Sequence, residues 1–233
     1  MPHFIGAIKE LRRQKHTNYI YYGNSSGASW AVVCYLILNG FVTPDHIKNA
    51  MRKVFAKSRP ISPIMTPIYC DLIDVMTPYW PSDLAERLSG ILHVGVSIST
   101  GHKFINKFAT NAELYNALLC SGTIALFSDY VSLIDDEVCL DGGYTFEEHM
   151  LPKNTIIIAS DIRLPLSMTT PPLSIYPILE ENGRRNVVHG LEKPIIIHVW
   201  KPIVLESWFL LHNCTPKNLK WASHIANITQ SRI

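Results

Sequence analysis

The segment that most constrains the fold of this chain is Gly23-Asn24-Ser25-Ser26-Gly27, which spells G-x-S-x-G. It follows a short strand-like apolar run at residues 19–22 and precedes a helix-like apolar run at residues 28–38. A serine on a sharp turn from strand to helix is held clear of the backbone, an arrangement called a nucleophile elbow. The two glycines of the motif leave room for the bend and for an approaching ester. The pattern therefore predicts Ser25 as a candidate nucleophile.

A second short motif, Asp141-Gly142-Gly143, lies far along the chain, and the strand-like run of residues 138–140 leads into it. Its carboxylate is a candidate partner for Ser25. Each residue also has a plainer interpretation, with Ser25 as the N-cap of the helix and Asp141 as a turn aspartate before two glycines. The sequence favours the catalytic interpretation because the two motifs occur together.

The composition narrows the class of protein. With 233 residues, of which 47% are hydrophobic and 17% are charged, the chain can form one sizeable globular domain. Its 21 basic and 19 acidic residues form no long run of either sign, so a nucleic-acid partner is not indicated. Five widely spaced cysteines without a C-x-x-C pair suggest neither a disulfide framework nor a zinc site. The acidic pair Glu147 and Glu148 is better explained as exposed than as a metal site.

The expected location follows from the lack of a recognisable targeting segment. The first residues do not resemble a signal peptide, because no basic region precedes a long apolar stretch. The run at residues 28–38 is too short to cross a bilayer, and residues 195–211 are interrupted by charged residues and a proline. We therefore expect a cytoplasmic protein.

The periodicity of the remaining chain indicates alternating helices and strands, and hence an α/β fold with a mostly parallel sheet. Helices are expected at residues 4–13, 28–38, 44–55, 81–88 and 110–119, and strands at residues 19–22, 91–99, 104–108, 138–140 and 155–159. Residues 58–68 and 164–177 are rich in proline and are expected to be irregular, whereas residues 202–228 are expected to be helical.

Four blocks in this order resemble the patatin-like phospholipase domain, in particular its adiponutrin and adipose triglyceride lipase-like branch. They are residues 23–27 with the following helix, residues 88–90 leading into 94–100, residues 117–122 ahead of 124–127, and residues 139–143. Together they span about 150 residues, and their common order is more specific than either short motif alone.

The resemblance implies a three-layer α/β/α fold over residues 1–200, with a helical extension at residues 201–233. It also implies a serine–aspartate dyad, in which Ser25 attacks an acyl ester and Asp141 acts as the base, with no metal or organic cofactor. The motif glycines, Gly142 and Gly143, would let the backbone turn tightly behind the base. The implied substrate is a glycerolipid, phospholipid or triacylglycerol, met at a membrane or lipid-droplet surface. Independently of the resemblance, the proline-rich segment 59–67 is a candidate lid.

The chain departs from the family pattern at its start. Family members have a first strand and a G-G-G-x-x-G loop before the opening helix, and backbone N–H groups of that loop stabilise the oxyanion. Residues 1–6 match the beginning of the helix that follows this loop, so the fold is expected to be N-terminally truncated and only the backbone N–H of Ser26 remains as a donor. Two interpretations stay open. The chain is part of an active hydrolase, or it is a catalytically inactive lipid-binding or regulatory relative.

Overall fold

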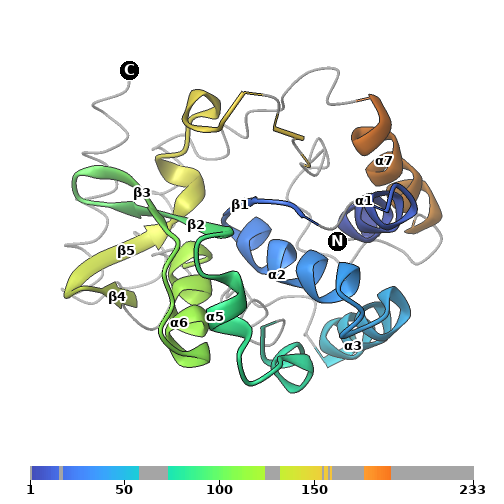
Figure 1. Cartoon of the computed structure of the whole chain (residues 1–233), viewed down its shortest axis with the longest axis horizontal. Coiled ribbons are helices and arrows are strands. Elements are labelled where there is room, and N and C mark those ends of the chain that lie inside the picture. Colours follow the sequence, from blue (N-terminus) through green and yellow to red (C-terminus); the bar gives the residue numbers. More distant parts are fainter. Residues whose placement is uncertain are drawn as a thin grey trace, which may run out of the picture.

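The computed structural model describes residues 2–15, 18–57, 73–123, 132–153, 155–156, 158 and 176–189 (Figure 1). This part of the chain is a mixed α/β structure, in which a small twisted sheet lies against helices. The elements in chain order are α1 (Pro2–Arg13), β1 (Tyr21–Asn24), α2 (Ser26–Leu38), α3 (Pro44–Lys57), η1 (Thr77–Tyr79), α5 (Leu84–Leu88), β2 (Leu92–Ile98), β3 (Gly101–Ile105), α6 (Asn111–Ser121), β4 (Ser132–Ile134), β5 (Glu137–Asp141), η2 (Gly142–Tyr144), η3 (Glu148–Met150) and α7 (Tyr176–His189).

Strand β2 is the centre of the sheet, because it pairs with β1, β3 and β5. A strand has only two edges, and β3 occupies one of them along most of β2. The other edge is shared by β1 and β5. Asn24, the last residue of β1, lies opposite Gly95, and Asp141, the last residue of β5, lies opposite Val96. Because β1 runs parallel to β2 and β5 runs antiparallel, the two strands approach each other along this edge from opposite directions. Their last residues therefore meet end to end.

The expectation of a mostly parallel sheet is wrong for the strands that the structure describes. Only β1 and β2 are parallel, whereas the pairings of β2 with β3, of β2 with β5 and of β4 with β5 are antiparallel. Two of these pairings are hairpins, since only Ser99 and Thr100 join β2 to β3, and only Asp135 and Asp136 join β4 to β5. A two-residue connection cannot join parallel strands. Positive φ angles of 54° and 60° at the two aspartates suit such a turn.

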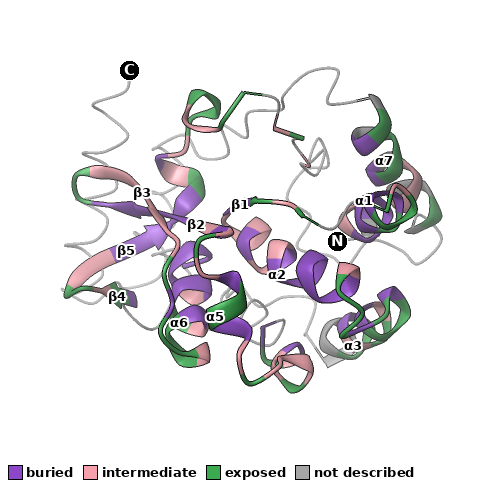
Figure 2. Cartoon of the chain, viewed as in Figure 1, coloured by how far each residue is buried: buried purple, intermediate pink, exposed green. Residues whose placement is uncertain are grey.

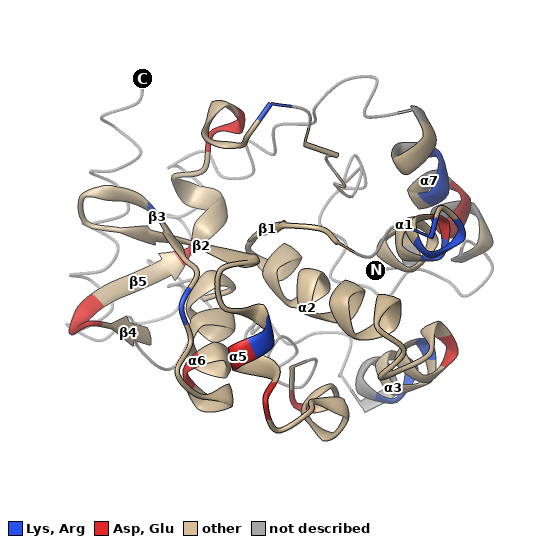
Figure 3. Ribbon diagram, viewed as in Figure 1, with Lys and Arg blue, Asp and Glu red and all other residues tan. Residues whose placement is uncertain are grey.

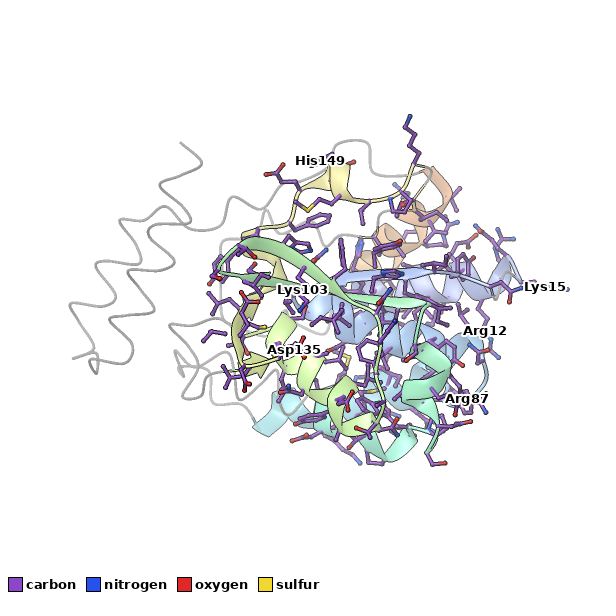
Figure 4. All side chains as sticks on the ribbon, turned by 60° about the vertical axis from the view of Figure 1, so that its left-hand side comes forward. Arg12, Lys15, Arg87, Lys103, Asp135 and His149 are labelled. Carbon is purple, nitrogen blue, oxygen red and sulfur yellow. The ribbon has the colours of Figure 1, made fainter. Side chains whose placement is uncertain are left out.

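Lys103 on β3 and Asp135 in the β4–β5 turn, both labelled in Figure 4, form an ion pair at 3.3 Å. The pair lies at the surface, so it contributes little to stability. It links the β2–β3 hairpin to the β4–β5 hairpin.

Helix α2 lies at the centre of the hydrophobic core. It carries no charged residue (Figure 3) and is buried along most of its length (Figure 2), as its uninterrupted apolar sequence requires. Along β2, Leu92, Val94 and Val96 alternate and are fully buried, so one face of this strand belongs to the same core. Helix α6 lies beside α2 and contributes Leu114 and Leu118. Thr110 begins α6 as expected, because its hydroxyl accepts a hydrogen bond from the Glu113 N–H.

The first helix is confirmed as amphipathic, with Ile5, Ile8 and Leu11 buried. It packs along α7, a helix that the sequence analysis did not predict. The two backbones approach most closely where Gly6 meets Glu180 and where Gly183 meets the carbonyl group of His3. Glu180 also joins three helices, because its carboxylate binds Lys9 of α1 and Lys48 of α3.

Three further expectations concern the second half of the chain and the segment after α3. The predicted strand at 155–159 is wrong for the described residues Thr155, Ile156 and Ile158, which lie outside any strand. The Thr155 hydroxyl donates to the Pro152 carbonyl at 2.6 Å, a local bond that competes with strand pairing, and Ile156 is 46% exposed. The suggested lid at 59–67 and the helical extension at 201–233 lie outside the described residues.

The close contact between α1 and α7 gives a test of the fold. Gly6→Ala is expected to lower the free energy of unfolding by about 2 kcal/mol, because a methyl group there would overlap the Glu180 backbone. Arg12→Ala on the exposed side of α1 is the matched control and should change stability by less than about 0.5 kcal/mol. Urea denaturation followed by circular dichroism measures both, and equal stability of the two variants would contradict the packing.

Candidate active site

Ser25 stands at the junction of β1 and α2, where the chain turns sharply. Its φ of 56° and ψ of −143° are rare for a residue with a side chain. The turn is possible because position 23 is a glycine, since a Cβ atom there would lie 2.7 Å from the backbone nitrogen of Ala28. Around Gly27, in contrast, a Cβ atom would meet nothing within 4 Å. The two motif glycines therefore differ, since Gly23 permits the bend and Gly27 borders open space.

Asp141 lies next to Ser25 because β5 runs along the same edge of β2 in the opposite direction to β1. Its backbone N–H donates to the Thr123 carbonyl at 2.8 Å, and its own carbonyl accepts a hydrogen bond from the Ser97 hydroxyl at 2.7 Å. Gly142 allows the end of β5 to lie close to β2, because a Cβ atom there would be 2.7 Å from the carbonyl carbon of Gly95. The backbone on both sides of the carboxylate is thus fixed by the sheet and by Thr123, which follows α6.

The two predicted residues meet. The Ser25 hydroxyl donates a hydrogen bond to Oδ2 of Asp141 over 2.7 Å, although the residues lie 116 positions apart. The other carboxylate oxygen, Oδ1, accepts the Gly143 N–H at 2.8 Å. Asp141 is therefore a turn aspartate through one oxygen and a partner of Ser25 through the other. Ser25 makes no side-chain cap on α2, so the alternative interpretation of this serine as an ordinary N-cap is not realised.

Burial raises the pKa of Asp141 to about 6, although its hydrogen bonds from Ser25 and Gly143 act in the opposite direction. The residue is 7% exposed, so the charged carboxylate is poorly hydrated. A carboxylate of raised pKa binds a proton more readily than an exposed one. The site thus pairs a hydroxyl with a carboxylate that is a stronger base than usual, which is what proton transfer from a serine requires.

Ser26 opens α2 directly behind Ser25. The first N–H groups of an α-helix have no acceptor in the preceding turn, and the helix dipole makes this end partly positive. The position of Ser26 at the start of α2 is compatible with the predicted oxyanion role of its N–H, which stays a prediction. Ser121, from the end of α6, lies under the elbow, where its hydroxyl donates to the Gly95 carbonyl at 2.7 Å and is 3.4 Å from the carbonyl oxygen of Ser25.

Sequence reasoning missed the polar residues that support the dyad, namely Ser97, Ser121, Thr145 and His102. Ser97 and Ser121 lie inside two of the four blocks, at 94–100 and 117–122, but no pattern assigned them a role. Thr145 and His102 carry no such signal, because they are defined by contacts with residues far along the chain. Within the described residues, no group of three or more His, Cys, Asp or Glu side chains could hold a metal ion. The helices of the same ranges include none that combines the length and the apolar character needed to cross a membrane.

Replacement of Ser25 tests the strain at the elbow. Both Ser25→Gly and Ser25→Ala remove the hydrogen bond to Asp141, so they differ mainly in backbone freedom. We expect Ser25→Gly to be more stable by about 1 kcal/mol, because glycine adopts the observed φ without a Cβ clash. Chemical denaturation of the two variants gives the difference directly. An alanine variant at least as stable as the glycine variant would show that the elbow is unstrained.

The two motif glycines give a second test. Gly23→Ala is expected to destabilise the fold by about 2 kcal/mol or more, because the new methyl group would overlap the first turn of α2. Gly27→Ala should be stable, since the same methyl group would meet open space and alanine favours a helix. Thermal unfolding distinguishes the pair, and similar melting temperatures for both variants would contradict the geometry.

Comparison with known proteins adds no relative to this picture: no protein-family model matches the chain, and no curated protein or solved structure shows significant similarity. The resemblance to patatin-like phospholipases therefore remains a prediction from the sequence blocks.

Proposed function

We propose that this protein is a serine–aspartate acyl hydrolase of the patatin type, which cleaves acyl esters of glycerolipids through an acyl-serine intermediate. The observation that carries the proposal is the 2.7 Å hydrogen bond from Ser25 Oγ to Asp141 Oδ2. It joins two residues that the sequence motifs had singled out independently, on an elbow and beside a carboxylate of raised pKa. A three-layer α/β/α arrangement completed by other parts of the chain belongs to the same proposal.

The chemistry follows from these contacts. Ser25 Oγ attacks the ester carbonyl carbon while its proton passes to Asp141 Oδ2. The carbonyl oxygen then carries a negative charge, which the Ser26 N–H and the positive end of α2 stabilise in this proposal. When the tetrahedral intermediate collapses, the protonated Asp141 gives its proton to the departing alcohol, leaving the acyl group on Ser25. Water then attacks the acyl-serine while Asp141 accepts its proton. When the second tetrahedral intermediate collapses, the bond from the acyl carbon to Ser25 Oγ breaks, the carboxylic acid leaves, and Asp141 returns the proton to Ser25 Oγ.

The substrate class and the location rest on the family resemblance. A glycerolipid, either phospholipid or triacylglycerol, would be met at a membrane or lipid-droplet surface by a cytoplasmic protein bound peripherally.

A second candidate is a non-catalytic lipid-binding or regulatory protein that retains the fold. The observation in its favour is that Ser26 supplies the one oxyanion donor that we can identify in the described residues. Removal of one such donor from an enzyme typically costs about 100- to 1000-fold in rate.

The free edge of β1 bears on the hydrolase proposal instead. Among the described strands, β1 pairs with β2 alone, so a further strand could pair with β1 next to Ser25.

A fluorophosphonate probe tests the proposal, because it labels only a serine that is activated as a nucleophile. We expect labelling of the wild type and none of Ser25→Ala. Asp141→Asn should slow labelling by about 100-fold or more, since the proton of Ser25 then has no acceptor of sufficient basicity. Folded but unlabelled wild-type protein that binds glycerolipid vesicles would support the second candidate instead.

The same assay predicts a pH dependence. Asp141 accepts a proton only as a carboxylate, so the rate of labelling should fall as the pH is lowered through about 6. An unburied aspartate would keep its activity to a lower pH, near the ordinary aspartate pKa of 3.8. Probe labelling measured over a series of buffers locates the midpoint, and a midpoint near this ordinary pKa would show that burial does not tune this base.

A further inference from the structure

A chain of three hydrogen-bonded side chains ends on the backbone of Asp141. The Ser97 hydroxyl donates to the Asp141 carbonyl oxygen at 2.7 Å. Oγ of Ser97 lies 2.7 Å from Oγ1 of Thr145, which in turn lies 3.1 Å from Nδ1 of His102. The chain connects β2, the segment after η2 and β3 to the last residue of β5. None of these three hydrogen bonds involves Ser25, so the chain reaches the dyad only through the backbone of Asp141.

Counting protons fixes the direction of every bond in this chain. A carbonyl oxygen can only accept, so the single hydroxyl proton of Ser97 is used on Asp141. Thr145 must then donate its hydroxyl proton to Ser97, and it has none left for His102. The bond between Thr145 and His102 therefore requires a proton on Nδ1 of the ring. The neutral imidazole is the Nδ1–H tautomer, and the charged ring also carries this proton.

The surroundings of the chain hold each member in place. Ser97 and Thr145 are each 1% exposed, so water cannot readily replace one of them in the chain. The His102 ring packs edge-on against Phe104 with centroids 4.6 Å apart, and it lies tilted against Phe146 with centroids 5.7 Å apart. It also lies over Gly95, where a Cβ atom would stand 2.8 Å from Nε2. A larger residue at position 95 would push the ring away from Thr145.

Only Asp141 and Leu140 of β5 pair with β2, and the Asp141 N–H bonds the Thr123 carbonyl at 2.8 Å. The Ser97 hydroxyl adds a bond to the Asp141 carbonyl, at the strand end whose carboxylate must stay within hydrogen-bond distance of Ser25. We propose that His102 is a positioning residue for Asp141, acting through Thr145 and Ser97 as the Nδ1–H tautomer. The catalytic part of this inference rests on the proposed function, whereas the tautomer does not.

The tautomer is measured by nitrogen NMR on the whole protein labelled with ¹⁵N-histidine, with the His102 signals identified by their loss in His102→Asn. We expect Nδ1 of the neutral ring to remain protonated and Nε2 to lose its proton. In Thr145→Val, which has the shape of threonine without its hydroxyl, the neutral ring should shift toward the Nε2–H form that free histidine prefers. An Nε2–H tautomer in the wild type would overturn the proposed chain.

The positioning role is measured by the rate of fluorophosphonate labelling at a pH well above the pKa of Asp141. We expect Thr145→Val and His102→Leu to slow labelling by about 10- to 100-fold, since small displacements of a catalytic group have effects of this size. Thr145→Ser keeps the hydroxyl, and His102→Asn keeps a donor close to the position of Nδ1, so both should remain within about threefold of the wild type.

His93→Asn is the matched control, because His93 belongs to β2 and stacks on Tyr22 at 4.4 Å without a bond to Thr145 or Ser97. It should label at the wild-type rate. Equal slowing by His93→Asn and His102→Leu, or no slowing by Thr145→Val, would overturn the positioning role. If His102→Leu does not fold, the Thr145→Val and Thr145→Ser pair decides.

A wild type that is not labelled at all would refute the proposed hydrolase and with it the catalytic part of this inference. The NMR experiment would still decide whether His102 supports Asp141 through the chain.

Discussion

The structure depends on the way in which two strands share one edge of β2. Because β3 occupies the opposite edge, β1 and β5 must follow one another along the remaining edge, and they do so from opposite directions. Their last residues pair with Gly95 and Val96, which are consecutive. This register brings Ser25, the residue after β1, within 2.7 Å of Asp141. A shift of either strand by two residues would separate the hydroxyl from the carboxylate by more than a hydrogen bond can span.

The same packing that brings the pair together also determines its chemistry. Asp141 is buried by the end of α6 and by the sheet, and burial raises its pKa to about 6. Burial of a charged carboxylate is unfavourable for stability, yet it makes the group a better base. Because the folded pKa lies above the unfolded value, this residue favours folding in acid, and that contribution is lost as the pH rises through about 6. Burial of the Asp141 carboxylate therefore lowers the stability of the fold above about pH 6 while it raises the basicity of the group.

Local patterns predicted the local structure well. The amphipathic helix at the start, the apolar helix after the elbow and the Thr110 cap of α6 all follow from nearest neighbours along the chain, and all are confirmed. The direction of the strands was not predictable in the same way, because the periodicity of a strand says nothing about its partner. Helix α7 was missed because Glu180, Glu181, Arg184 and Arg185 interrupt its apolar pattern, and its helical form depends on close packing of Gly183 against α1.

The sequence by itself determined which groups are available: a serine on a turn between a strand and a helix, and an aspartate followed by two glycines at the end of a strand. These are local properties, fixed by residue type and spacing. Only the tertiary structure decided that the two groups meet, and that Ser97, Thr145 and His102 stand behind Asp141. Such contacts join residues more than 40 positions apart, and they depend on strand register and burial, which no local pattern encodes.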